Sequence, residues 1–128
     1  MIDRDYLIDL AVNRYFANVD KKNLEPVLDC FNADAFLCVQ TQPIVHEGRD
    51  QGIKNMFETL FSSYTKIWHG NFEHTVDAEA ERISSRFDVI LEDEKGGKVE
   101  LHNCNHWYCK DGRFQRVYVF MSGENVLR

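Results

Sequence analysis

The strongest constraint on the fold is a change of hydrophobic period near residue 65. Before this point apolar residues recur every three or four positions, as in helices with one buried face. After it they alternate with polar residues, as in strands of a half-buried sheet. Helices that precede the strands, rather than alternate with them, predict an α+β domain with a mostly antiparallel sheet.

The same patterns predict where each element lies. The predicted helices cover 3–20, 23–32 and 50–64, and the predicted strands cover 35–40, 66–77, 81–93, 98–110 and 113–122. Asn23 and Asp50 are the expected N-caps of the second and third helices, and 43–48 is read as a loop. Asp111-Gly112 suits a tight hairpin turn between the last two strands. The last four strands should therefore form a meander that wraps over the helices.

Composition narrows the class of protein. The 128 residues suffice for one hydrophobic core, so we expect a single domain spanning 1–128. Nine Phe, five Tyr and two Trp residues provide large side chains that can line a cavity as well as fill one. The net charge of -6 disfavours nucleic acid and anionic membrane surfaces, because an excess of Lys and Arg is missing.

The sequence predicts a cytoplasmic protein without metal or cofactor. The N-terminus is acidic, and no run of about eighteen apolar residues occurs, which disfavours a secretion signal and a membrane span. The cysteines form no CxxC pair, so we expect reduced thiols rather than a zinc site or a disulfide framework; they lie at 30, 38, 104 and 109.

Three segments carry a resemblance to a known superfamily. They are RYFANVDKKNLEPVLDCFNADA at 14–35, HEGRDQGI at 46–53 and NHWYCKDGRFQRV at 105–117. Together with the order of elements, they resemble the superfamily of ketosteroid isomerase, SnoaL-like cyclases and nuclear transport factor 2. This resemblance implies a cystatin-like cone fold, in which N-terminal helices pack on a curved, mostly antiparallel sheet that encloses a pocket.

Within that superfamily, the match to ketosteroid isomerase is incomplete. Tyr15 matches the tyrosine that stabilises the oxyanion, and Asn105 stands where that family has a protonated aspartic acid. The position of the family's catalytic aspartate falls on Val39, next to Gln40, and neither side chain can abstract a proton. Steroid isomerase chemistry is therefore not expected.

A second group of relatives fits better. Scytalone dehydratase, bile acid dehydratase and hexachlorocyclohexane dehydrochlorinase share an aspartate that ends helix one and a histidine that opens the next long strand. These positions match Asp20 and His69, and the bile acid enzyme also has a tyrosine five residues before the aspartate, as Tyr15 is here. All three enzymes perform eliminations with a His-Asp pair as the base, so the resemblance implies that role for His69 and Asp20.

Local geometry limits which side chains can meet. On an ideal α-helix Tyr15 and Asp20 lie about 140° apart, so they share a face only if the helix ends or distorts before Asp20. On a regular strand His74 points away from His69, and we take it as exterior. In the 98–110 strand, Leu101, Asn103, Asn105 and Trp107 share one face, and His102, Cys104, His106 and Tyr108 share the other.

Each candidate also has a purely structural interpretation. Tyr15 can equally be a core aromatic residue whose hydroxyl lies at the edge of the core. Asp20 can be a solvated turn residue beside two lysines, and His69 can be a hydrogen-bonded histidine of a strand. His46 beside Glu47 is most simply an incidental loop histidine. Asn105 is the better polar candidate, since a buried amide needs partners, which Tyr15 or a ligand would provide.

The resulting hypothesis is a cofactor-independent lyase or isomerase with a small-molecule ligand in a central pocket. Asp20 orients His69, His69 removes a carbon-bound proton, and Tyr15 with Asn105 stabilises the oxygen that gains charge. One alternative is a non-catalytic binding or dimerisation domain of the same fold, and another is a small subunit of a larger oxygenase. The outward face bearing His106 and Tyr108 predicts a homodimer.

Overall fold

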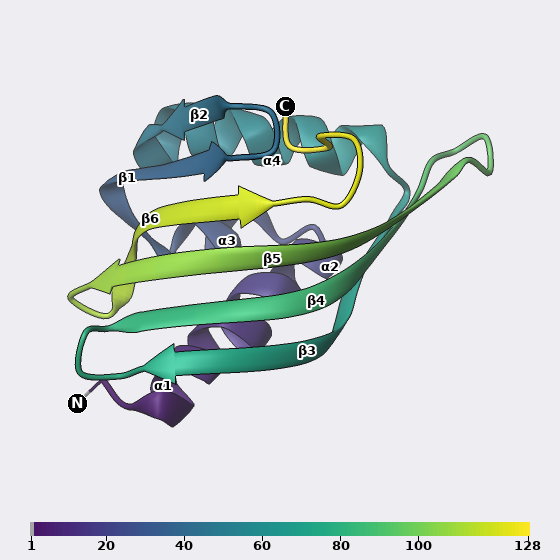
Figure 1. Cartoon of the computed structure of the whole chain (residues 1–128). Helices are drawn as coiled ribbons and strands as arrows, with labels where there is room; N and C mark the ends of the chain where they lie inside the picture. Colours follow the sequence, from purple (N-terminus) through teal and green to yellow (C-terminus); the bar gives the residue numbers. More distant parts are fainter. Residues whose placement is uncertain (1) are drawn as a thin grey trace.

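A curved sheet with helices on one face forms the body of the molecule (Figure 1). The computed structural model describes residues 2–128, and within them six strands pair in the order β2-β1-β6-β5-β4-β3. The strands are β1 (Phe31–Val39), β2 (Ile44–Glu47), β3 (Lys66–Asp77), β4 (Arg82–Glu92), β5 (Lys98–Lys110) and β6 (Arg113–Phe120). The helical segments are α1 (Arg4–Asp9), η1 (Leu10–Phe16), α2 (Ala17–Asp20), α3 (Leu24–Leu28), η2 (Gly48–Ile53) and α4 (Lys54–Ser63). The predicted α+β cone fold is confirmed.

The second half of the chain follows the predicted meander closely. Strands β3 to β6 pair antiparallel with their neighbours in sequence order. The β5–β6 hairpin turns at Asp111 and Gly112, whose φ angles of 54° and 80° are those that the Asp-Gly pair was expected to adopt. These strands could be predicted from alternating apolar residues, because one face of the sheet is buried and the other is not.

The first half departs from prediction at the end of the second helix. That helix ends at Leu28, and Phe31, expected on its buried face, instead begins β1 and pairs with Phe114 of β6. Phe31 is completely buried in either arrangement, so its hydrophobicity could not distinguish a helix from a strand. The parallel pairing of β1 with β6 is a long-range contact, which local propensity does not report.

The predicted loop at 43–48 contains the short edge strand β2, which pairs antiparallel with β1. The π-helix η2 starts directly after Glu47, so Asp50 lies inside the helix rather than at its cap. Gly52 permits this tight junction, because a Cβ there would lie 2.6 Å from the backbone nitrogen and oxygen of Glu47. A side chain at this position would push η2 away from β2.

The first predicted helix is continuous but contains the π-helix η1. The Ala17 N–H bonds the carbonyl of Val12, five residues back, instead of the α-helical partner four residues back. Tyr15 and Phe16, although adjacent, are both buried, with 3% and 4% of their surface exposed. The helix therefore distorts before Asp20, as a shared face for Tyr15 and Asp20 requires.

A β-bulge in β3 reverses the expected orientation of His74. Gly70 pairs with Asp88 but Glu73 pairs with Arg86, so β3 holds one residue more than β4 between these pairs. His74 therefore returns to the inner face, where its Nδ1 bonds the hydroxyl of buried Ser85. The prediction that His74 is exterior was wrong because the strand is not regular.

The hydrophobic core lies between the helices and the inner face of the sheet (Figure 1). Trp107, Phe31, Phe57, Phe87 and Phe114 are its largest completely buried side chains. None of the helices within residues 2–128 has the length and hydropathy needed to cross a membrane.

Candidate active site

Asp20 and His69 form a hydrogen-bonded pair at the edge of the sheet. One carboxylate oxygen of Asp20 lies 2.6 Å from His69 Nδ1, and the other accepts the His69 backbone N–H at 3.0 Å. The backbone N–H is available because β3 is an edge strand, paired on one side with β4. Asp20 ends α2, so the meeting of helix end and strand edge brings together residues 49 positions apart.

This geometry sets the tautomer of the histidine. A carboxylate only accepts hydrogen bonds, so the His69 Nδ1 facing Asp20 carries a proton. In the neutral ring, Nε2 then keeps its lone pair and is the basic atom. The His69 side chain is 10% exposed, and that of Asp20 is 22% exposed. The pair is therefore a partly sheltered base with an oriented lone pair.

Aromatic rings hold the imidazole in place. The Phe16 ring stacks on His69 with 4.4 Å between centroids and an interplanar angle of 24°, and Phe87 contacts it at 5.8 Å. Phe72 also stacks on Phe16, with 5.5 Å between the ring centroids. Because η1 turns Phe16 into the core, the helix that supplies Asp20 also supplies the ring that packs on His69.

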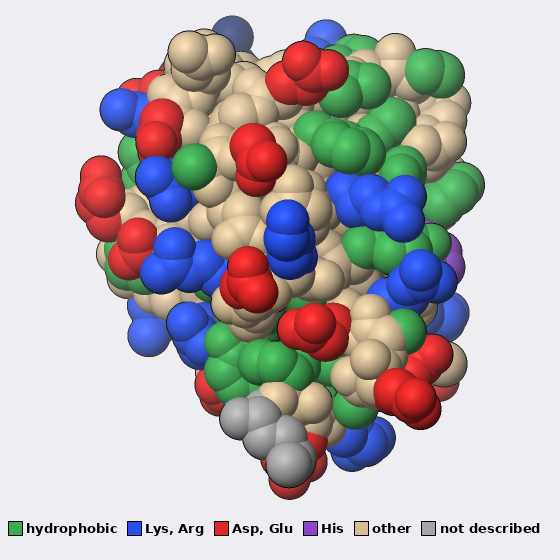
Figure 2. All heavy atoms as spheres, turned by 90° about the vertical axis from the view of Figure 1, so that its left-hand side faces the viewer, with side chains coloured by type: hydrophobic (Ala, Val, Ile, Leu, Met, Phe, Trp, Pro, Cys, Tyr) green, Lys and Arg blue, Asp and Glu red, His purple; other side chains and the backbone are tan. Residues whose placement is uncertain are grey.

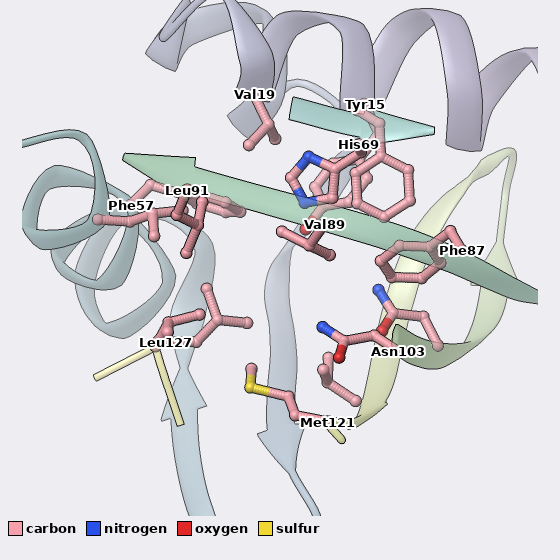
Figure 3. A pocket seen from close by; sticks show the side chains of 15 residues that line it. Tyr15, Val19, Phe57, His69, Phe87, Val89, Leu91, Asn103, Met121 and Leu127 are labelled. Atoms are coloured by element: carbon pink, nitrogen blue, oxygen red, sulfur yellow. The ribbon is translucent and has the colours of Figure 1, made fainter. Parts of the chain in front are cut away.

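A cavity borders His69 between the helices and the sheet (Figure 3). Its polar lining consists of Tyr15, His69, Asn103 and Asn105. The apolar lining consists of Phe16, Val19, Phe57, Leu60, Phe87, Val89, Leu91, Val119, Met121, Val126 and Leu127. The centre of a water-sized atom can occupy only about 30 Å³ of it. Asp20 lies behind His69 and is not part of the wall.

Tyr15 borders the cavity from a cage of aromatic rings. Its ring makes edge contacts with Phe31, Phe57, Trp107 and Phe114, at centroid distances of 5.4 to 6.2 Å. Burial raises the pKa of its hydroxyl far above the ordinary value, so the group is a neutral donor at any physiological pH. Tyr15 combines the two interpretations of the sequence, because it is both a core aromatic and part of the cavity wall.

Two asparagines of β5 complete the polar lining. Asn105 is 3% exposed, and its side-chain oxygen has no hydrogen-bond partner within residues 2–128. Tyr15 does not satisfy it there, so the remaining partners for this acceptor are a buried water or a ligand that donates a hydrogen bond. Asn103 lies on the same face and is 6% exposed. Period two predicts Asn103 on this face together with Asn105, and a second buried amide was the signal that could have identified it as a candidate site residue.

A second His-Asp pair lies on the outer face of the sheet. His102 Nδ1 is 2.7 Å from Asp88 Oδ1, but the His102 side chain is 65% exposed. His46 is also away from the cavity, with its Nε2 2.9 Å from the Leu127 carbonyl. Within residues 2–128, no three His, Cys, Asp or Glu side chains are grouped closely enough to hold a metal ion.

Solved structures with the same architecture are known, although their sequences differ widely from this one. No family model and no curated protein matches the sequence. AusH from Aspergillus nidulans is similar over 98% of this chain and 89% of its own, with a TM-score of 0.81 and 16% identity. A Shewanella denitrificans protein assigned as a SnoaL-like polyketide cyclase has a TM-score of 0.81 and 10% identity, over 93% of this chain and 92% of its own. A Catenulispora acidiphila protein with a ketosteroid isomerase-like fold, solved with trimethylamine, has a TM-score of 0.73 and 9% identity, over 84% of this chain and 82% of its own. This chain has the SnoaL-like fold.

Within this SnoaL-like domain, the cavity offers one candidate base. Val39 on β1 is completely buried and apolar, and the neighbouring Gln40 lines a hollow on the outer face instead. Of the cavity-lining side chains, Tyr15 and His69 are titratable, and the buried Tyr15 hydroxyl stays protonated. Among the side chains that line the cavity, His69 is therefore the one that can accept a proton.

Proposed function

We propose that the chain is a cofactor-independent lyase or isomerase acting on a small, largely apolar carbonyl or hydroxy compound. The observation that carries this proposal is the His69–Asp20 pair, with its 2.6 Å hydrogen bond, at the wall of an apolar cavity. Asp20 holds the Nδ1 proton and leaves Nε2 as the base. The apolar walls exclude water, which strengthens the electrostatic interactions of the reacting groups.

The chemistry begins with transfer of a carbon-bound proton to His69 Nε2. The C–H electron pair forms a carbon–carbon double bond, and the carbonyl π pair moves onto oxygen as an enolate. In an isomerisation, the imidazolium returns its proton to a different carbon. In an elimination, the enolate re-forms the carbonyl and expels a β-leaving group, which takes the imidazolium proton. Asp20 stabilises the imidazolium in both cases.

Neutral hydrogen-bond donors are needed where negative charge develops on oxygen. Tyr15 can donate its hydroxyl proton, because burial raises its pKa and keeps it protonated. Asn105 can donate through its side-chain amide, and both residues line the cavity with His69. These donors give Tyr15 and Asn105 the roles expected from the sequence.

The small cavity supports the alternative of a binding domain without turnover. The centre of a water-sized atom has only about 30 Å³ to move in, which leaves room for very few atoms, so a substrate has to displace wall side chains. Met121, Val126 and Leu127 form the wall that lies outside both sheet and helices. Displacement of these side chains would disturb no backbone ladder between strands.

Hydrogen–deuterium exchange tests catalysis without knowledge of the natural substrate. Small enolisable ketones, from acetone to acetophenone, are incubated with protein in D₂O, and loss of their α-proton signals is followed by NMR. We expect exchange faster than in buffer, which His69→Ala abolishes and His102→Ala preserves. If no ketone exchanges faster with wild-type protein than with His69→Ala, the binding-domain alternative replaces the enzyme.

The outer sheet face supports a homodimer as the functional unit. A hollow of about 380 Å³ there is lined by Gln40, His106, Tyr108, Arg116, Tyr118 and Phe120. Phe120 is 46% exposed, and the Arg116 guanidinium lies 3.9 Å from the Tyr108 ring centre. The right-hand edge of Figure 2, where this face is seen from the side, shows hydrophobic and basic side chains together. Light scattering tests the dimer, and a monomer at micromolar concentration would contradict it.

A further inference from the structure

Asn103 faces His69 across the cavity. It lies on the inner face of β5, two residues before Asn105, and 6% of its surface is exposed. Figure 3 shows its side-chain amide nitrogen on the side of the cavity where His69 lies. The cavity thus has a base on one side and this amide on the other.

A backbone contact fixes which atom Asn103 presents to the cavity. The Ser122 backbone N–H lies 3.4 Å from Asn103 Oδ1. A backbone N–H only donates, so the atom that faces it has to be the oxygen. The NH₂ group of Asn103 then remains for the cavity, which Asn103 lines. Asn105 lacks such a contact, since its oxygen is unpaired.

We propose that Asn103 binds the carbonyl oxygen of the substrate and orients it against His69. The ligand class is a compact apolar ketone or aldehyde with an enolisable C–H. Its C–H faces His69 Nε2, and its oxygen accepts from the Asn103 NH₂ group. This inference rests on the proposed function, because that function supplies the C–H acid whose oxygen needs a donor.

The electron movement gives Asn103 a role in the reaction. When His69 takes the proton, the negative charge moves from carbon to the oxygen that Asn103 contacts, and no other atom gains or loses electrons. A hydrogen bond to this oxygen is stronger in the enolate than in the ketone, so it accelerates the step. Within residues 2–128 no hydrogen bond sets the direction of the Tyr15 hydroxyl, whereas the Ser122 N–H orients Asn103 before the ligand arrives.

The test uses acetophenone labelled with ¹³C at the carbonyl. Binding is measured first in the His69→Gln protein, which cannot abstract the proton, by the infrared C=O stretch of the bound ketone. Variants Asn103→Leu and Asn103→Asp are added to this background. Asn103→Asp retains an acceptor for the Ser122 N–H, but its carboxylate cannot donate a hydrogen bond to the ketone. If that aspartate were protonated it could still donate, so Asn103→Leu, which cannot donate at all, is measured as well. Cys104→Ser is the matched control, because it lies between the two asparagines on the opposite face.

We expect the bound C=O stretch to lie below its value in hexane, to return toward that value in both Asn103 variants, and to stay unchanged in Cys104→Ser. With His69 restored, Asn103→Leu should slow α-proton exchange about a hundred- to a thousandfold. An unchanged stretch in Asn103→Leu, or no saturable binding of acetophenone, overturns the inference. A stretch that depends on Asn103 without any exchange overturns the proposed catalysis and leaves the binding role standing.

Discussion

The two His-Asp pairs of this protein have nearly the same bond and very different surroundings. His69 and Asp20 are 2.6 Å apart beside an apolar cavity, and the His69 side chain is 10% exposed. His102 and Asp88 are 2.7 Å apart on the outer sheet face, where the His102 side chain is 65% exposed. In the first pair the carboxylate comes from a helix end, and in the second it comes from the neighbouring strand.

Under the proposed function, the hydrogen bond alone does not make a histidine a catalytic base. Water competes for the exposed ring and screens the charge of Asp88, whereas stacking on Phe16 holds the ring of His69. The small space beside His69 is mostly apolar and is also lined by Tyr15, Asn103 and Asn105. The hollow beside His102, of about 180 Å³, lies on the outer face and is lined by Asp88, Glu100 and other residues of that face. This contrast predicts that the reactivity of each histidine follows the surroundings of its ring rather than its bond to a carboxylate.

The largest difference is expected when each histidine is removed. His69→Ala should lower ketone α-proton exchange by about a hundred- to ten-thousandfold, since general-base catalysis contributes that much. His102→Ala should leave the rate unchanged within error. NMR exchange rates on both variants check this, and an equal loss in both would mean that the exposed pair also reaches the ketone.

Removal of the Tyr15 hydroxyl should have the next largest effect. Tyr15→Phe keeps the ring among its aromatic neighbours and should lower exchange by up to about a hundred- to a thousandfold if the hydroxyl donates to the developing charge. The free energy of unfolding, from urea denaturation, should change little and serves as the control. A wild-type rate in Tyr15→Phe would return this residue to a core role.

A smaller loss of exchange rate is expected when the carboxylate that orients His69 is neutralised. Asp20→Asn leaves the imidazole in place but removes its charged acceptor, and we expect a loss of roughly ten- to a hundredfold, as when histidines lose an orienting partner at metal sites. Asp88→Asn is the matched control on the outer face. If Asp20→Asn exchanges protons as fast as wild type, the orientation of His69 does not depend on Asp20.

The smallest effect concerns acid stability. Hydrogen bonds from Asn71 and His102 lower the pKa of Asp88 below its usual 3.8. Its contribution to stability is therefore present above about pH 4 and is lost as the pH falls through the lowered pKa. Between about pH 5 and about pH 2, the free energy of unfolding of Asp88→Asn should fall less than that of wild type, because the variant lacks this carboxylate.

Urea denaturation across this pH range measures the acid effect. The difference between wild type and Asp88→Asn should shrink in 1 M salt (roughly a 3 Å screening length), because the pair is exposed. A difference that is independent of salt would show that Asp88 is sheltered in solution, contrary to the contrast between the two pairs.

Different signals predicted the fold and the candidate site. Strands β3 to β6 were predictable because one buried face imposes period two, and Asp20 and His69 were selected because a carboxylate can orient an imidazole that acts as a base. Their pairing across 49 residues came from the resemblance rather than from any local pattern. The ends of helices, by contrast, depend on long-range contacts, which hydrophobic periodicity and helix propensity do not report.

The missed features are those where the backbone departs from regular geometry. The bulge after Gly70 turned His74 inward, and the π-helix η1 brought Phe16 onto His69. Asn103 was missed for another reason, since its orientation depends on Ser122, which lies beyond the end of β6. No periodic pattern in the sequence carries these three pieces of information.

The π-helix makes the site sensitive to chain length in a way that substitutions would not detect. Deletion of one residue within Leu10–Phe16 would let the helix regain its α-helical hydrogen bonds, because each bond there spans one residue too many. The turns on either side would keep their relative orientation, because the wider π turn takes up the extra residue, and Asp20 would stay beside His69. The deletion would instead remove the widened turn that lets both Tyr15 and Phe16 face the core, so one lost codon would take the aromatic packing away from an intact His-Asp pair.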